Sequence, residues 1–269
     1  MNKLIKNPII IVLLFITGIL LLSSIKNPLM EFYGVNGRIA ISTKHFIDAT
    51  FNILYALVSI YFIKKYRLID LAGLGKQKFK NWFLLIFPLY IILLNWEETA
   101  DINYARIPTI NYIAALIWCF SVGLMEELML RGFIQSLFIK KYANTKKRLV
   151  LSVLGAAFIF GILHLLNFDK GLYGEITQVL YATFIATMFG ALLLRTHKIW
   201  PLIIIHGLID LFGNLETFKL TETSILIAPK EPQGIGNSIV VILALLPCFI
   251  YGLILLRKVN VDNIQDKLN

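Results

Sequence analysis

Four side chains that can move protons or stabilise an oxyanion lie inside apolar stretches of the sequence. They are Glu126, His164, His206 and Asp210. Peptide hydrolysis needs these types of group, because a base must take a proton from water and a donor must stabilise the developing oxyanion. We therefore expect Glu126 and one histidine to activate water. His206 is expected to donate to the oxyanion, and Asp210 to orient His206 or to share its proton.

Two further charges lie beside Glu126 in the stretch SVGLMEELMLRGF, which covers residues 121–133. Positions four apart share a helix face, whereas adjacent positions diverge by about 100°. Glu127 and Arg131 are therefore predicted to form an i,i+4 ion pair, with the acid in the favourable amino-terminal position. Glu126 is predicted to turn away from this pair and to point into a cavity.

The histidines follow the same spacing. Phe160 and His164 lie four apart in FIFGILHLL, where Gly161 leaves room for a neighbouring helix. His206 and Asp210 lie four apart in WPLIIIHGLID. Each of these pairs is predicted to share one helix face.

The composition is that of an integral membrane protein. The 269 residues are 58% hydrophobic and only 16% charged, with a mean hydropathy of +0.74, which is far from an ordinary soluble domain. Since a helix needs roughly 17–25 apolar residues to cross the hydrocarbon layer, we predict an all-α, polytopic membrane protein with about eight transmembrane helices. The predicted spans are 8–25, 46–63, 82–96, 110–138, 149–166, 176–194, 200–214 and 237–256. No linker divides the chain, so one integral membrane domain is expected over residues 1–269.

Loop charges predict the orientation of these spans. Most of the 26 basic residues fall in loops 1–7, 64–81, 139–148, 195–199 and 257–269, while Glu97, Glu98 and Asp101 lie in a loop on the opposite side. Basic loops face the cytoplasm, so we expect a multi-pass protein of the cell membrane with both termini cytoplasmic. The net charge of +10 is explained by these loops beside anionic headgroups. The bilayer is therefore an expected partner, and nucleic acid is not.

The three spaced motifs together resemble the CAAX protease and bacteriocin-processing family, also called CPBP or Abi, which includes the Ras-converting CAAX prenyl endopeptidases. The motifs are Glu126-Glu127-x-x-x-Arg131, Phe160-x-x-x-His164 and His206-x-x-x-Asp210. The resemblance implies a four-helix catalytic core in spans 4–7, over residues 108–215. It implies that Glu126, His164, His206 and Asp210 are catalytic and that Glu127, Arg131 and Phe160 support them. The last position commonly carries Asn in the eukaryotic branch, so Asp210 departs from that pattern.

The metal content of the site stays open at this stage. Members of the family have been described as metalloproteases and also as metal-free glutamate and histidine proteases. Glu126, His164 and His206 could hold a catalytic zinc ion with an open position. However, the H-E-x-x-H helix of other zinc proteases is absent from the sequence. We favour direct activation of water by Glu126 without a cofactor, with zinc as the alternative.

The predicted function is an intramembrane endopeptidase that cleaves a membrane-associated, prenylated or propeptide substrate. The family resemblance offers removal of a CAAX tripeptide or maturation of secreted peptides, and the frequent Lys, Ile and Asn favour a bacterial source. One alternative is a non-catalytic bacteriocin-immunity or peptide-binding membrane protein. A further alternative is a proton-coupled transporter, which is disfavoured because neither inverted repeats nor paired broken helices occur.

If the fifth and seventh predicted helices start at the same level in the membrane, His164 and His206 are expected at different depths. At ~1.5 Å per residue, His164 lies ~22 Å from Leu149 at the start of its span, whereas His206 lies ~9 Å from Trp200. A common site requires tilt, a deep start of the seventh helix at Pro201, or an extension of the fifth helix from about Lys146.

Overall fold

The computed structural model describes residues 7–35, 38–95, 107–215, 224–225 and 232–265. Glu97, Glu98 and Asp101, which support the predicted orientation, lie outside the described residues. The helices are α1 (Pro8–Ser23), α2 (Lys26–Tyr33), α3 (Ile41–Lys65), η2 (Trp82–Leu89), α4 (Tyr90–Leu94), α5 (Thr109–Glu126), η5 (Glu127–Gln135), α6 (Ser136–Tyr142), α7 (Lys146–Leu163), η6 (His164–Asn167), α8 (Gly171–Thr196), α9 (Trp200–Gly213), α10 (Ile235–Arg257) and α11 (Asp262–Gln265).

The predicted all-α membrane fold is confirmed. In the part of the chain that the structure describes, six helical segments are long and apolar enough to cross a membrane, and Trp82–Leu94 and Trp200–Gly213 are shorter apolar helices. Each overlaps one of the eight predicted spans. The strands described are the two-residue β1 (Arg38–Ile39) and β2 (Ser224–Ile225), which pair antiparallel.

The chain folds into two compact units. Unit 1 comprises Met1–Ser59, Phe87–Glu126 and Ile203–Ala228, and unit 2 comprises Ile60–Ile86, Glu127–Leu202 and Pro229–Asn269. Each unit is described by itself. The single domain expected over residues 1–269 stays a prediction.

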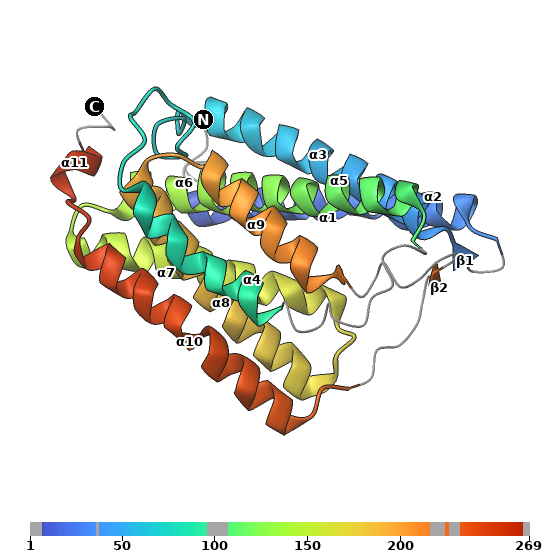
Figure 1. The fold of residues 1–269 in the computed structure, drawn as a ribbon. Coiled ribbons are helices and arrows are strands. Elements are labelled where there is room, and N and C mark those ends of the chain that lie inside the picture. Colours follow the sequence, from blue (N-terminus) through green and yellow to red (C-terminus); the bar gives the residue numbers. More distant parts are fainter. Residues whose placement is uncertain (1–6, 36–37, 96–106, 216–223, 226–231, 266–269) are drawn as a thin grey trace. The chain divides into compact units, whose positions relative to one another are not determined.

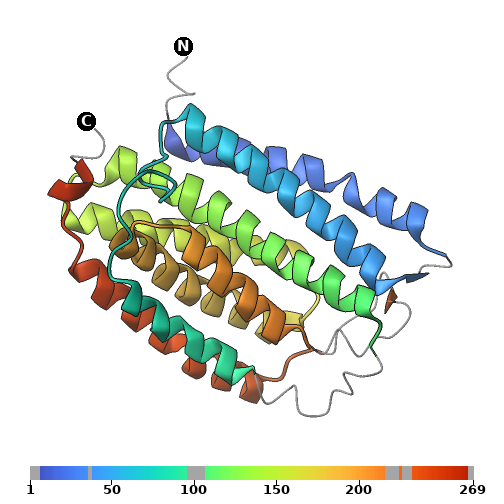
Figure 2. The same ribbon diagram turned by 45° about the horizontal axis from the view of Figure 1, so that its top comes forward.

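In unit 1, α1, the amino-terminal part of α3, and α5 run side by side (Figure 2). Hydrogen bonds between side-chain hydroxyl and amide groups connect these helices, as is common between membrane-spanning helices. Ser23 on α1 and Tyr55 on α3 share a hydrogen bond of 2.7 Å between their oxygens. Asn52 on α3 donates to Ser121 on α5 over 3.1 Å. These bonds fix α5, which carries Glu126 as its last residue.

In unit 2, α10 lies along α8 (Figure 1), and the two helices run in the same direction. Their backbones touch at Gly252, where an added Cβ would lie 2.9 Å from the amide nitrogen of Met188. The α7 helix also packs against α8, through Gly161, whose Cβ would lie 2.6 Å from the Val179 carbonyl oxygen. The expected role of Gly161 in leaving room for a neighbouring helix is therefore confirmed.

The α7 helix begins at Lys146, three residues before the predicted start at 149. Thr145 caps it, since the Thr145 hydroxyl accepts a hydrogen bond from the Arg148 amide over 3.3 Å. The extension from Lys146 considered from the sequence is thus present. It lengthens the distance from the start of this helix to His164.

Candidate active site

Two glycines bring α5 and α9 into backbone contact in unit 1. A Cβ added at Gly123 would lie 2.8 Å from the Ile203 carbonyl oxygen and 2.9 Å from the Gly207 amide nitrogen. A Cβ added at Gly207 would lie 2.7 Å from Cδ1 of Phe120. Small residues allow this close approach of membrane helices. The contact lies within one turn of both Glu126 and His206, so it sets the separation of these two side chains.

His206 lies between two carboxylates. Its Nε2 atom is 3.3 Å from Oε2 of Glu126 and 3.8 Å from Oδ2 of Asp210. The imidazole is 10% exposed, and the two acidic side chains are 17% and 24% exposed. All three side chains are therefore mostly buried, and the two carboxylates are more exposed to solvent than the imidazole. Asn214 donates from its amide to the Asp210 backbone carbonyl over 2.8 Å, which ties the last turn of α9 to this position.

The helix changes its winding between the two adjacent glutamates. The α5 helix ends at Glu126, and the π-helical segment η5 begins at Glu127. A π-helix has i→i+5 hydrogen bonds and is often found at functional sites. The Ser136 hydroxyl donates to the Arg131 carbonyl, five residues earlier, over 2.8 Å. The two glutamates thus belong to differently wound turns of one continuous span.

The predicted ion pair between Glu127 and Arg131 is present in unit 2. Nη1 of Arg131 lies 2.9 Å from Oε1 of Glu127, and the two side chains are 2% and 0% exposed. The guanidinium also lies over two aromatic rings, with centroids 5.5 Å away for Phe160 of α7 and 5.4 Å away for Phe189 of α8. Cation–π contacts of this kind add to the ion pair in a desolvated site. Arg131 therefore holds η5 against α7 and α8.

His164 caps the carboxyl end of α7 and starts the short helix η6. Its Nδ1 atom lies 3.0 Å from the Phe160 carbonyl oxygen, and its ring packs edge to face against the Phe160 ring at 4.6 Å between centroids. A carbonyl oxygen can only accept, so Nδ1 carries the proton in the neutral imidazole. Nε2 is then the nitrogen with the lone pair, which is the form that a general base needs.

The predicted site residues belong to both units, and the contacts within each unit are described separately. Glu126, His206 and Asp210 lie together in unit 1. The other residues, which lie together in unit 2, are Glu127, Arg131, Phe160 and His164.

Of the residues named for the zinc alternative, Glu126 and His206 lie in unit 1 and His164 lies in unit 2. Among the residues that the structure describes, no group of three or more His, Cys, Asp or Glu side chains is placed to hold a metal ion. Whether the site uses a metal stays a prediction.

Three structural features of the candidate site were not predicted from the sequence. Phe189 stacks on Arg131 from a helix that carries no motif residue, so no spacing rule could have indicated it. The π-helical winding of η5 likewise has no signal in the local sequence. Gly123 and Gly207 did offer one, since glycines beside motif residues in apolar spans commonly mark close helix packing.

The spanning helices define a polytopic helical membrane protein, and within it the structure describes a buried ion pair in unit 2 and a carboxylate–imidazole cluster in unit 1. Residues 108–212, which run from just before α5 to the last turn of α9, match the family model described as Type II CAAX prenyl endopeptidase Rce1-like. For this segment the match confirms the resemblance to the CAAX protease and bacteriocin-processing family. No curated protein and no solved structure matches the chain.

Proposed function

We propose that the protein is an intramembrane endopeptidase that hydrolyses a peptide bond in a membrane-associated substrate. One observation carries the proposal: a glutamate, a histidine and an aspartate converge within the segment that matches the family model, with Nε2 of His206 3.3 Å from Oε2 of Glu126. Paired carboxylate and imidazole groups supply both the proton transfer and the hydrogen-bond donor that amide hydrolysis requires.

In the proposed reaction, Glu126 takes a proton from a water molecule as the water oxygen bonds to the scissile carbonyl carbon. His206 donates a hydrogen bond to the oxygen that becomes negative. Asp210, whose Oδ2 atom lies 3.8 Å from His206 Nε2, stabilises positive charge on the imidazole by electrostatic attraction. The carbon–nitrogen bond then breaks, and Glu126 returns its proton to the leaving amine. The catalytic role of His164 stays a prediction from the family resemblance.

The substrate is proposed from the family alone. The matching family is described as a CAAX prenyl endopeptidase, so a prenylated peptide is the first candidate, and a leader peptide cut from a secreted precursor is the second. No cofactor is proposed.

Cleavage by the purified full-length protein tests the proposal. Wild type and Glu126→Gln are incubated in lipid nanodiscs with prenylated and leader-peptide substrates, with and without a zinc chelator. Loss of a general base lowers the rate by about 10²–10⁴-fold, so the glutamine variant should be nearly inactive. Glu31→Gln is the matched control, because Glu31 is an exposed glutamate on α2 of the same unit, and it should cleave as wild type does.

Each arm has an outcome that contradicts a specific part of the proposal. Full activity of Glu126→Gln would exclude this residue as the base. Inhibition by the chelator that added zinc reverses would replace direct activation of water with metal-assisted hydrolysis. Binding of a peptide without cleavage by the wild type would favour the non-catalytic peptide-binding alternative.

A further inference from the structure

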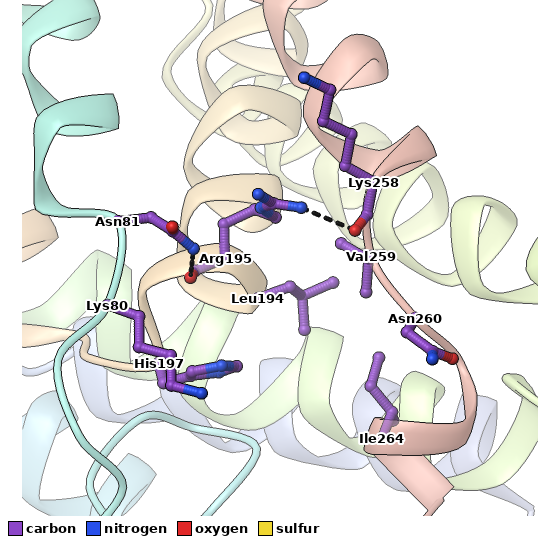
Figure 3. A pocket seen from close by; sticks show the side chains of 9 residues that line it. All are labelled: Lys80, Asn81, Leu194, Arg195, His197, Lys258, Val259, Asn260 and Ile264. Atoms are coloured by element: carbon purple, nitrogen blue, oxygen red, sulfur yellow. Dashed lines mark hydrogen bonds between the residues drawn. The ribbon is translucent and has the colours of Figure 1, made fainter.

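We propose that unit 2 contains a second ligand site, a basic pocket that binds a phosphate group of a lipid headgroup or of a soluble phosphate compound. The pocket has a volume of about 210 Å³ and lies where the carboxyl ends of α8 and α10 meet the segment before η2 and the start of α11 (Figure 3). Its lining consists of Lys80, Asn81, Leu194, Arg195, His197, Lys258, Val259, Asn260 and Ile264. This site is independent of the proposed peptidase function.

Hydrogen bonds between its walls hold the pocket in shape. The Asn81 amide donates to the Arg195 carbonyl over 2.9 Å, and Nη1 of Arg195 donates to the Lys258 carbonyl over 2.6 Å (Figure 3). The Lys80 amide nitrogen donates to the Thr196 carbonyl over 3.1 Å. Three segments that are distant in sequence are therefore tied together around the pocket.

The same hydrogen bonds reduce the repulsion that an anion would meet at the carboxyl ends of these helices. The carboxyl ends of helices present carbonyl oxygens with a partial negative charge of about 0.5, which disfavours an anion. Here the carbonyls of Arg195, Thr196 and Lys258 already accept hydrogen bonds. These three carbonyl oxygens are therefore already paired with donors from the pocket wall.

The charged side chains that line the pocket are basic. None of the nine lining residues is acidic, whereas Lys80 and Arg195 are cationic and His197 can be; Lys258 contributes its backbone carbonyl, and its side chain points away from the pocket (Figure 3). Lys146 adds a further positive charge, because its Nζ atom donates to the Val259 carbonyl in the pocket wall. Basic pockets between membrane helices are the usual sites for anionic headgroups.

Arg195 brings a positive charge to the wall of the pocket. Its Nη1 atom donates to the Lys258 carbonyl, and its Nε–H, which has no acceptor among the described residues, is buried away from solvent. The guanidinium fork matches phosphate oxygens in pairs. His197 and Lys80 come from the opposite side of the pocket to Asn260 and Ile264 (Figure 3), so a phosphate between them would meet donors from more than one wall.

The volume of the pocket and its apolar wall restrict the kind of ligand that can bind. A volume of about 210 Å³ is below the roughly 300–1,000 Å³ that encloses a drug-sized ligand, so only a small group enters. Leu194, Val259 and Ile264 form an apolar side. A phosphate attached to a short carbon chain fits both sides of this lining.

Calorimetric titration of the full-length protein in a neutral detergent tests the proposal. The probes are dioctanoyl phosphatidic acid, inorganic pyrophosphate and, as a zwitterionic comparison, dioctanoyl phosphatidylcholine. Each basic residue near an anionic lipid contributes about 1 kcal/mol, so Lys80→Gln/Arg195→Gln should bind the preferred anionic probe about 30-fold more weakly than wild type. Lys76→Gln/Lys78→Gln removes two exposed charges from the same loop outside the pocket and should bind as wild type does.

The arms separate the two sources of phosphate. Tight binding of phosphatidic acid alone identifies a lipid headgroup site, and equal or tighter binding of pyrophosphate identifies a site for soluble phosphate compounds. Arg195→Lys keeps the charge but loses the fork, so an intermediate affinity is expected even if the double variant unfolds. Equal losses in the pocket and control variants, or no preference for either anion over phosphatidylcholine, would overturn the proposal.

Discussion

Replacing Gly123 with alanine tests whether backbone contact between α5 and α9 sets the geometry of the site. The new Cβ would lie 2.8 Å from the Ile203 carbonyl oxygen and 3.3 Å from Cβ of His206. Carbon and oxygen atoms in close contact are normally about 3.3–3.6 Å apart. The two helices must therefore separate locally by about 0.5 Å or more.

This separation acts directly on the pair that carries the proposed chemistry. The distance of 3.3 Å between Glu126 Oε2 and His206 Nε2 would become about 3.8 Å, which is beyond hydrogen-bond range. A displacement of up to 1 Å near a reacting group lowers rates by as much as ~10²-fold. Overpacking of this kind also costs about 1–3 kcal/mol of stability.

The measurement is kcat/KM on whichever substrate the wild type cleaves, together with thermal unfolding of the purified variant in detergent. Gly18→Ala on α1 is the matched control, because a Cβ at this position meets no atom within 4 Å. It should retain wild-type activity, and its stability should be no lower than that of the wild type. A Gly123→Ala protein with both values unchanged would refute the inference that this contact sets the separation of Glu126 and His206.

Two further predictions concern stability. Arg131→Ala should lower the free energy of unfolding by about 3–5 kcal/mol, because it leaves the buried Glu127 carboxylate without its ion-pair partner; Glu127→Gln/Arg131→Met should cost less, and an equal or larger loss in the double variant would contradict this account. Tyr55→Phe and Ser23→Ala should each cost about 1 kcal/mol by removing the bond between α1 and α3. In chemical unfolding of the combined variant the two losses should not add, and additive losses would show that the hydroxyls do not interact.

The sequence predicted the membrane spans well because they depend on local composition. Runs of apolar residues must be helical in a bilayer, and each of the eight predicted runs overlaps a helix in the structure. The Glu127–Arg131 pair was also predictable, since i,i+4 spacing places both side chains on one face. The structure confirms this ion pair, with 2.9 Å between Nη1 of Arg131 and Oε1 of Glu127.

Features that depend on tertiary packing were not predictable in the same way. The contact of Phe189 with Arg131 joins residues that are distant in sequence. The π-helical winding that begins at Glu127 has no signal in the local sequence, and the segment that adopts it is buried along its whole length. An ideal α-helix gave the correct direction for the ion pair but not the change of winding at Glu126.

The buried ion pair also bears on how the protein enters the membrane during synthesis. Glu126, Glu127 and Arg131 lie near the middle of the apolar segment Thr109–Tyr142. On the scale of translocon insertion, a charged residue at the centre of a helix disfavours insertion by about 3 kcal/mol. Three such residues oppose insertion of the isolated segment by ~9 kcal/mol, whereas α7 and α8 bring the rings of Phe160 and Phe189 over which Arg131 lies. This segment is therefore expected to leave the insertion machinery together with the helices that follow it, as one co-inserted group.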